Sequence, residues 1–486
     1  MNHHETPLFT ALKDHIARDP IQFHIPGHKR GRGMNNVFRD FIGTNALEMD
    51  LINIAPLDDL HHPTGPIKAA QELTASAFRA DSTFFSVQGT SSAIVAMIMS
   101  AVKPGDKILV PRNIHKSVLT ALIITGAHPI FLHPKLDETF GIAHGLSVES
   151  IKDALTQHSD IRAVLVTNPT YFGVACDLKR IVEISHAFGV PVLVDEAHGT
   201  HTYFHDSLPL SAMAAGADIA ATSVHKLGGS LVGASILNVR SGIIDPLHVQ
   251  VIMSMLTTTS TSYLMLASLD AARQDLVLHG RERFERAIQM ANRIRDEING
   301  IPGLRCLDKR VLQDSATYQI DATKLTISVK DLGIRGYDVE LMLRKEFNIE
   351  VELSDLYNIL CIFTGSETEN DMAQLVRGLR FIAEGFSKYS RTPEVSVKLP
   401  PLPVLQITPR EAFYAKTKRV RLSEAVGETI AETIMVYPPG IPILLPGEMV
   451  TQEAIDFTEE NLRAGLPVQG TDDPEIQYVK VVCSRS

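Results

Sequence analysis

Two segments of this sequence place ionisable side chains directly after a run of apolar residues. Asp195 and His198 follow VPVLV, and Lys226 follows IAATSV. A lysine at the end of a buried strand is partly desolvated, so its amine can bind an aldehyde cofactor as a Schiff base. A carboxylate at a neighbouring strand end can pair with a protonated pyridine nitrogen and make the ring an electron sink, although a helix N-cap is the alternative role for Asp195. These residue types indicate pyridoxal-phosphate chemistry.

A third segment, Gly89-Thr90-Ser91-Ser92, stands between a strand pattern and a helical pattern. Backbone N–H groups at a helix N-terminus, together with neighbouring hydroxyls, form a phosphate site that needs no lysine. A simple helix cap with a spare serine fits the same residues. The segment therefore indicates either a phosphate cradle or an ordinary helix start.

Two other segments could reach the ring of such a cofactor. RNIHKS places His115 at the start of a helix, where its imidazole could stack on the ring from the side opposite Ala197, or simply cap the helix. Asn168-Pro169-Thr170 follows the apolar run AVLVT and could touch the ring hydroxyl.

The elements that must position these residues alternate between helical spacing and short Val/Ile/Leu-rich runs from about residue 66 onward. Apolar strands between helices predict a mainly parallel sheet covered on both faces. In open sheets of this kind, ligands bind at the carboxyl ends of the strands, where Asp195 and Lys226 are expected. Before this region, the density of Gly and Pro predicts irregular structure with one short helix near residues 9–16.

The chain of 486 residues is too long for one core, and four parts are expected. An N-terminal arm takes residues 1–60, and an α/β large domain with a mainly parallel sheet takes 61–275. A smaller α+β domain takes 276–395, and a C-terminal α/β segment takes 396–486 after the Pro-rich VKLPPLPVL.

Composition narrows the classes of function. A formal net charge of -10 argues against nucleic acid or an anionic membrane as the main partner. The four cysteines form no CxxC pair and predict reduced thiols in a cytoplasm, with no metal site. The N-terminal residues contain no apolar stretch of signal-peptide length, and no run is long enough to span a bilayer.

Taken together, the motifs resemble those of the bacterial ornithine/lysine/arginine decarboxylases, which are fold-type I pyridoxal-phosphate enzymes. The resemblance spans residues 23 to about 469, and the short form is most similar to biosynthetic arginine decarboxylases. The motifs that carry it are PGHK (26–29), GTSSA (89–93), RNIHKS (112–117), TNPTY (167–171), DEAHG (195–199), SVHK (223–226), TTTSTSY (257–263) and YPPGIPILLPGE (437–448).

The resemblance implies a role for each matching residue. Lys226 would form the Schiff base, Asp195 would pair with the ring nitrogen, and His115 would stack on the ring. His198, where some relatives carry an aromatic residue, and Lys226 are the candidates for returning a proton to Cα. The remaining cofactor contacts would be Thr90, Ser91, Ser92, Ala197, Ser223 and His225, joined by Thr259 and Ser260 from the partner chain of a homodimer or higher homo-oligomer.

The resemblance implies decarboxylation of a basic amino acid, with arginine converted to agmatine and CO₂ for polyamine biosynthesis. Lysine and ornithine stay open as substrates. A fold-type I aminotransferase or aldolase, or a pyridoxal-phosphate-binding protein without activity, is the alternative of another class. A guanidinium needs a carboxylate that accepts two parallel N–H bonds. Glu448 is the first candidate, with pairing to a nearby arginine as its alternative role, and the others are Asp58, Asp59, Glu352 and Asp355.

Overall fold

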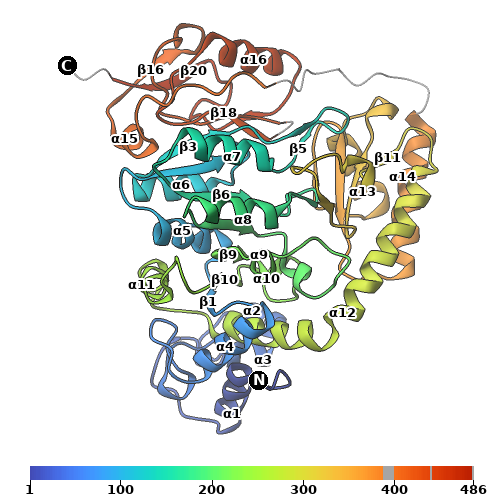
Figure 1. The fold of residues 1–486 in the computed structure, drawn as a ribbon. Coiled ribbons are helices and arrows are strands. Elements are labelled where there is room, and N and C mark those ends of the chain that lie inside the picture. Colours follow the sequence, from blue (N-terminus) through green and yellow to red (C-terminus); the bar gives the residue numbers. More distant parts are fainter. Residues whose placement is uncertain (387–398, 438–439, 484–486) are drawn as a thin grey trace. The chain divides into compact units, whose positions relative to one another are not determined.

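The computed structural model describes residues 1–386, 399–437 and 440–483 (Figure 1). The chain divides into two compact units. Unit 1 comprises residues 1–101 and 191–282, and unit 2 comprises residues 102–190 and 283–486. The expected boundary between residues 395 and 396 lies outside the described residues, and the division into four parts stays a prediction.

Unit 1 contains the N-terminal arm and four strands of the large sheet. Its elements are α1 (Pro7–Ala17), α2 (Asn36–Ile42), α3 (Thr44–Met49), η1 (Ala55–Leu57), α4 (Pro66–Ala77), β1 (Ser82–Ser86), α5 (Gly89–Ala101), β8 (Val192–Glu196), η2 (Thr200–Tyr203), α9 (Ala212–Ala215), β9 (Ile219–Thr222), α10 (Val224–Leu227), β10 (Ser235–Val239), α11 (Pro246–Leu256) and α12 (Tyr263–Asn299), which continues into unit 2.

The four strands of unit 1 lie in the order β1-β10-β9-β8. β8 and β9 are parallel, as the sequence predicted, and Asp195 stands opposite Ala221 in their register. β10 runs antiparallel to both β9 and β1, so this one strand departs from the parallel expectation. The strands β8, β9 and β10 are completely buried, which explains their near-continuous apolar sequences.

The N-terminal arm is more helical than its Gly and Pro content predicted. It forms α1, α2 and α3 in place of one helix, because Asn35 caps α2 and Gly43, with a φ of 86°, separates α2 from α3. Asp270 of α12 accepts the N–H groups of Leu8 and Phe9 and thereby caps α1. These hydrogen bonds attach the first helix of the arm to α12.

Unit 2 contains three parallel strands, a smaller sheet and the C-terminal region. Its elements are β2 (Lys107–Pro111), α6 (Lys116–Thr125), β3 (His128–Leu132), β4 (Leu136–Asp137), β5 (Ile142–Ala143), α7 (Val148–Gln157), β6 (Ile161–Thr167), β7 (Val174–Ala175), α8 (Leu178–Ala187), β11 (Arg305–Cys306), η3 (Lys309–Val311), β12 (Gln319–Ile320), β13 (Lys324–Ser328), η4 (Lys330–Leu332), α13 (Gly336–Phe347), β14 (Leu353–Ser354), β15 (Asn358–Ile362), α14 (Glu369–Phe386), α15 (Pro409–Tyr414), β16 (Thr417–Arg421), η5 (Leu422–Glu424), β17 (Ile434–Val436), β18 (Ile441–Leu444), α16 (Gln452–Arg463), β19 (Val468–Gln469) and β20 (Tyr478–Val482).

The strands of unit 2 form parallel and antiparallel sheets in separate regions. β2 pairs in parallel with β3 and with β6, as expected for the α/β large domain. The smaller sheet has the order β11-β13-β15-β14 with antiparallel pairs, and α13 and α14 lie beside it (Figure 1). This arrangement is the α+β region that the sequence predicted after the long helix.

The C-terminal region forms two small antiparallel sheets, β16-β20 and β18-β17-β19, together with α16. It has a hydrophobic cluster of its own, built from residues between Leu422 and Val481. Within the motif at 437–448, residues 438–439 lie outside the described residues. A separate cluster of this kind is what an independently packed segment requires.

None of the helices in the described part of the chain is long and apolar enough to cross a membrane.

Candidate active site

Lys226 lies on the short helix α10, directly after β9. Ser223 follows the last residue of β9 with extended backbone angles, and the chain then turns through Val224–Leu227. The Lys226 Nζ atom lies 2.7 Å from Nε2 of His198, a residue that follows the parallel neighbour β8. The structure thus brings together two residues that the sequence analysis had nominated for one reaction.

Asp195 is the next-to-last residue of β8 and is 5% exposed. Its Oδ1 atom accepts the N–H of Ala197 at 3.1 Å, a local contact that fixes the carboxylate at the strand end. Since β8 and β9 are parallel neighbours, Asp195 and the start of the Lys226 loop lie at the same sheet edge. This confirms the expected placement of both residues at the carboxyl ends of the strands.

Three hydroxyls from separate elements meet next to this loop. Thr90 of α5 hydrogen-bonds to the Ser223 hydroxyl and, at 2.7 Å, to the hydroxyl of Ser235, the first residue of β10. Ser91, on the same helical turn as Thr90, is exposed, and Ser92 is half-buried. The predicted phosphate residues Thr90 and Ser223 are therefore in contact, and Ser235 joins them.

His225 is half-buried, and its Nδ1 atom lies 3.0 Å from the carbonyl oxygen of Ala234. Thr259 and Ser260 are exposed in the segment between α11 and α12, as residues intended for another chain would be. Their contact with a partner stays a prediction. Asp59 accepts the N–H of His61 at 3.0 Å, and its substrate role is likewise untested.

The carboxylate of Asp58 accepts hydrogen bonds from backbone N–H groups. Its oxygens accept the N–H groups of Asp59, Thr64, Gly65 and Ile67, the last two at the start of α4, at 2.7–3.1 Å. Burial acts to raise the pKa of Asp58, but these hydrogen bonds outweigh it and leave the pKa below its ordinary value. Asp58 thus holds the turn that begins α4, and its role as a substrate ligand stays a prediction.

Glu448, the first candidate for the guanidinium clamp, is bound by an arginine of this chain. Both of its oxygens are bound by Arg112, at 2.5 Å from Nη1 and 2.7 Å from Nη2, and each of the two side chains is 1% exposed. The N–H of Leu445 also donates to Glu448, at 2.7 Å. Arg112 and Leu445 take three of the roughly four acceptor positions of this carboxylate, so pairing with an arginine, the alternative role named above, is the one observed.

All three nitrogen atoms of the Arg112 guanidinium donate hydrogen bonds. Nε donates to the carbonyl of Pro442 at 2.8 Å, Nη2 donates to that of Ile443 at 3.0 Å, and the guanidinium lies 4.8 Å from the centre of the Phe131 ring. Arg112 connects the end of β2 to the segment around β18. It stands in the RNIHKS motif, but the sequence analysis gave it no role.

His115 and Asn168 belong to unit 2. The Nδ1 atom of His115 accepts the N–H of Ser117 at 3.2 Å, so this residue caps α6, as one of its two expected roles required. The Oδ1 atom of Asn168 accepts the N–H of Cys176 at 2.9 Å, and its buried Nδ2 has no hydrogen-bond partner in the described part of the chain. Ring stacking by His115 and a contact from Asn168 to a ring hydroxyl stay predictions.

Glu352 and Asp355, also nominated for the substrate, are engaged within unit 2. Tyr171 donates its hydroxyl proton to Glu352 in a short hydrogen bond. Asp355 accepts the N–H groups of Tyr357 and Asn358, each at 2.8 Å.

Glu196 is the main residue of this site that the sequence analysis missed. It is completely buried and accepts hydrogen bonds from Tyr203, Thr222 and the N–H of Ala212. It stands in the DEAHG motif beside Asp195, so the signal was present. A charged residue at the end of a wholly apolar strand could have been recognised as a buried group in need of partners.

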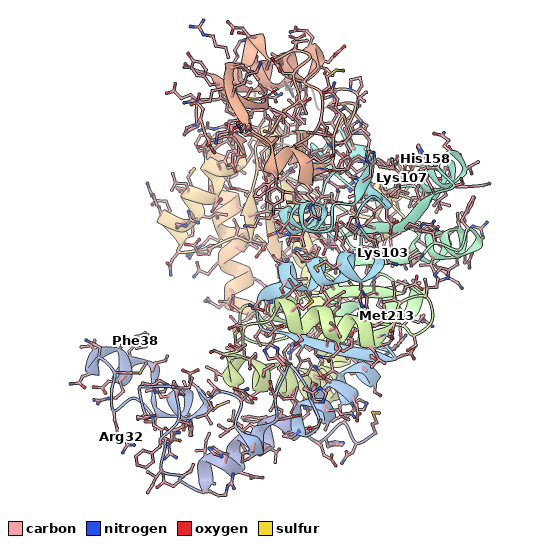
Figure 2. The ribbon with its side chains drawn as sticks, turned by 90° about the vertical axis from the view of Figure 1, so that its left-hand side faces the viewer. Arg32, Phe38, Lys103, Lys107, His158 and Met213 are labelled. Atoms are coloured by element: carbon pink, nitrogen blue, oxygen red, sulfur yellow. The ribbon has the colours of Figure 1, made fainter. Side chains whose placement is uncertain are left out.

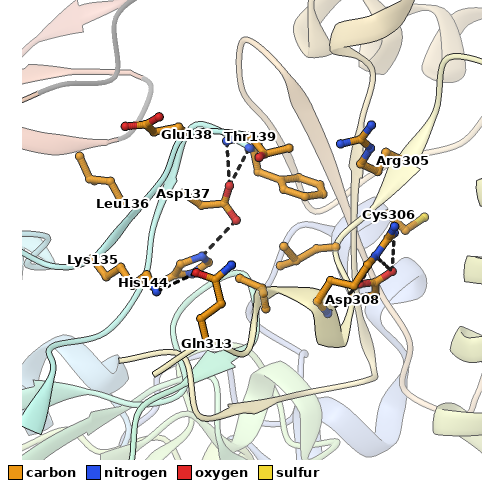
Figure 3. A pocket seen from close by; sticks show the side chains of 14 residues that line it. Lys135, Leu136, Asp137, Glu138, Thr139, His144, Arg305, Cys306, Asp308 and Gln313 are labelled. Carbon is orange, nitrogen blue, oxygen red and sulfur yellow. Dashed lines mark hydrogen bonds and ion pairs between the residues drawn. The ribbon is translucent and has the colours of Figure 1, made fainter. Parts of the chain in front are cut away.

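A pocket of about 370 Å³ lies elsewhere in unit 2 (Figure 3). Asp137 and His144 lie together on one side of it, with Nε2 of His144 3.4 Å from Oδ2 of Asp137, and Arg310 is paired with Asp308. None of the predicted site residues, all of which are described by the structure, lines this pocket. Among the described residues there is no group of three or more His, Cys, Asp or Glu side chains that could hold a metal ion.

Comparison with known proteins gives one consistent family. The model of "Orn/Lys/Arg decarboxylase, major domain" matches residues 6–371, and that of the C-terminal domain matches residues 395–464. The chain is 59% identical over 483 residues to an arginine decarboxylase of Bacillus subtilis, covering 99% of both chains. It is 56% identical to an arginine decarboxylase of Bacillus anthracis, covering 99% of this chain and 98% of the relative.

Among solved structures, the constitutive lysine decarboxylase of E. coli is similar in fold. It has a TM-score of 0.83 at 23% identity, and the match covers 99% of this chain and 82% of that one.

Proposed function

Because the chain belongs to the Orn/Lys/Arg decarboxylase family, we propose that it is a pyridoxal-phosphate enzyme that converts arginine to agmatine and CO₂. The observation that carries the chemistry is the 2.7 Å contact between Lys226 and His198 at the strand edge that also holds Asp195. The choice of arginine is supported by the relatives named arginine decarboxylase at 56–59% identity. We also propose a role in polyamine biosynthesis and a cytoplasmic location.

The residues of unit 1 fit pyridoxal phosphate. Gly89 has a φ of 77°, and a Cβ added to it would meet nothing within 4 Å, so open space lies beside the start of α5. The first N–H groups of a helix have no acceptor within it and favour an anion. With the Thr90 and Ser223 hydroxyls in contact nearby, this helix start is the proposed phosphate cradle.

Each residue of this edge has a definite task in the proposed reaction. When bound, the cofactor supplies an electron-accepting ring for the electron pair left as the bond from Cα to the carboxylate breaks. The carboxylate of Asp195 would hold a proton at the ring nitrogen. The amine of Lys226 would bind the aldehyde carbon, and His198 is placed to accept or return a proton at Nζ.

The site is proposed to be completed by a second copy of the chain. Unit 1 exposes large apolar side chains on its arm, where Phe23 is 95% exposed and Phe41 is 90% exposed, and Figure 2 labels the exposed Phe38 there. On α11, Leu247 and Val251 are exposed four residues apart, which places them on one helical face. Exposed apolar surface on this scale is typical of an interface, and homodimers are the commonest assembly.

The attachment of the cofactor can be tested directly. Borohydride reduction of the protein loaded with pyridoxal phosphate, followed by peptide mapping, should place the pyridoxyl group on Lys226. Lys226→Arg keeps the positive charge but cannot form the bond, so it should stay unlabelled. A label on another lysine in the wild-type protein would exclude the assignment.

The substrate is tested by incubating the loaded enzyme with arginine, lysine and ornithine in turn and identifying the amine formed. Agmatine should form fastest. A preference for lysine or ornithine would end the arginine proposal and leave decarboxylation standing.

The shared site is tested by mixing two inactive chains, Lys226→Ala and Ser260→Arg. Ser260 is exposed, so the arginine should not prevent folding. If the site is composite, one intact site can form in each mixed dimer and part of the activity should return. The exposed Ser366→Arg is the matched control and should be active alone. No recovery after confirmed subunit exchange would count against the shared site.

A further inference from the structure

A row of buried polar side chains crosses the four strands of unit 1. Glu196 ends β8, Thr222 ends β9, Asn238 lies in β10 and Thr83 lies in β1. Thr222 donates to Glu196 at 3.1 Å, Asn238 reaches Thr222 at 3.5 Å, and Thr83 donates to Asn238 at 2.7 Å. Glu196 is the one member of this row that can carry a charge.

Glu196 collects donors from three segments that are distant in sequence. The Tyr203 hydroxyl donates to Oε2 at 2.7 Å, the Thr222 hydroxyl donates to the same oxygen, and the Ala212 N–H donates to Oε1 at 2.7 Å. All three donors are neutral. The carboxyl group therefore joins η2, the end of β9 and the start of α9 to the end of β8.

The segments joined in this way are those that carry the reactive residues. Tyr203 ends η2, which starts two residues after His198, and Thr222 directly precedes the Lys226 loop. A second hydrogen bond connects the same two segments, because the Thr200 hydroxyl donates to the carbonyl of Ser223 at 2.6 Å. The distance between Lys226 and His198 is set by these two segments, and Glu196 holds both.

The burial of an ionisable group at this position has an energetic cost that an amide or an apolar side chain would avoid. Desolvation raises the pKa of Glu196 to about 7, while its three donors act in the opposite direction and the charge of Asp195 adds to the rise. The groups that face it are Asp195 on its own strand, Tyr203 from η2, Thr222 from β9 and the Ala212 N–H from α9. A role in holding the neighbouring segments in place would explain why a glutamate stands at this buried position.

We propose that Glu196 is a positioning residue, whose carboxyl group holds the His198 and Lys226 segments so that their two nitrogens stay within hydrogen-bond distance. This inference rests on the proposed function only for its effect on turnover. The geometry itself concerns the side chains of this chain and can be measured without a substrate.

The test uses Glu196→Gln and Tyr203→Phe. The amide keeps the size of the side chain, and the phenylalanine keeps the ring that lies 4.9 Å from Phe78 while removing one donor. Asp270→Asn is the matched control, because Asp270 is a buried carboxylate with a raised pKa that accepts the N–H groups of Leu8 and Phe9 at the start of α1. If one of the two variants fails to fold, the other still decides the question.

Three measurements distinguish positioning from simple support of the fold. In the loaded enzyme, kcat should fall about tenfold to a hundredfold with KM little changed, since small misplacements of reacting groups have effects of this size. The pH at which the absorbance of the lysine-bound cofactor changes should shift. In protein freed of cofactor, the pH profile of acylation of Lys226 by an amine-directed reagent should shift as well.

The control variant Asp270→Asn should leave all three measurements at wild-type values even where its melting temperature falls. If the Glu196 and Tyr203 variants lower the melting temperature but leave the acylation profile and the cofactor absorbance unchanged, Glu196 has only a structural role and the proposal is overturned. If the wild-type protein shows no decarboxylation, the proposed function fails. The acylation profile then still decides the positioning role.

Discussion

Two regions of the molecule each bury a glutamate completely, and they compensate it in different ways. In the C-terminal region, Glu448 is paired through both oxygens with the guanidinium of Arg112. At the end of β8, Glu196 receives three hydrogen bonds from neutral donors and no cation is among them. Both side chains are at most 1% exposed.

The neutral donors around Glu196 leave its carboxyl group able to respond to pH. A buried ion pair keeps its charges because each ion replaces the water that the other has lost. A buried carboxylate with neutral donors keeps only part of that compensation, and burial therefore raises the pKa of Glu196 to about 7. We conclude that the second region can change its charge near neutral pH.

The strongest test of this contrast is Glu448→Ala. It leaves the guanidinium of Arg112 buried without its counter-charge, and such losses cost about 3–5 kcal/mol. We expect a large fall in the urea concentration that unfolds the C-terminal region. Glu411→Ala, in the exposed capping box of α15, is the control in the same region and should cost about 1 kcal/mol. Equal effects of the two changes would contradict the assigned role of the ion pair.

The next test is the pH dependence of stability. Unfolded Glu196 ionises near its ordinary pKa of 4.5, whereas in the folded protein it keeps its proton to about pH 7. Between these values the folded state binds more protons, so its stability falls as pH rises, by about 3 kcal/mol in total. Glu196→Gln should lose this slope, as judged by urea unfolding at several pH values. Asp355→Asn should instead change the slope between pH 3.8 and about 6.

The contrast also explains which features the sequence could predict. Asp195 and Lys226 were placed at one sheet edge because strand ends are marked by where apolar runs stop, and the parallel register of β8 and β9 confirms this placement. The direction of β10 was not predictable, since a buried strand has the same apolar pattern in either direction. Local patterns predict an element and its end, but not its orientation.

The partners of buried charges were the other failure. Arg112 and Glu448 are 336 residues apart, and no local pattern couples positions so distant in the chain. Glu448 was interpreted as a substrate ligand because only its type and its position in the 437–448 motif were visible. Glu196 was missed because its place at a strand end was visible but its partners Tyr203, Ala212 and Thr222 were not. In both cases the missing information was tertiary contact.

A smaller effect is expected when both members of the ion pair are replaced. In Arg112→Met combined with Glu448→Met, no charge is left buried without a partner, and apolar replacement of a buried pair is often neutral. The carbonyls of Pro442 and Ile443 lose their donors, which should cost about 1–2 kcal/mol together. The double variant should therefore unfold at a higher urea concentration than Glu448→Ala alone. A double variant less stable than the single one would show that the pair contributes net stability.

The smallest expected effect, and the most specific, is that of Thr222→Val. The change keeps the shape of the side chain and removes one of the three donors to Glu196, at a cost of about 1 kcal/mol. Because a hydroxyl that donates to a carboxylate favours its ionised form, the pKa of Glu196 should rise further in this variant. The loss of stability should then be larger above neutral pH than at mildly acidic pH, where Glu196 is protonated in both proteins. In the background of Glu196→Gln, which cannot ionise, Thr222→Val should cost the same at every pH. A pH-dependent cost that persists in that background would mean that the Thr222 hydroxyl affects the ionisation of a group other than Glu196.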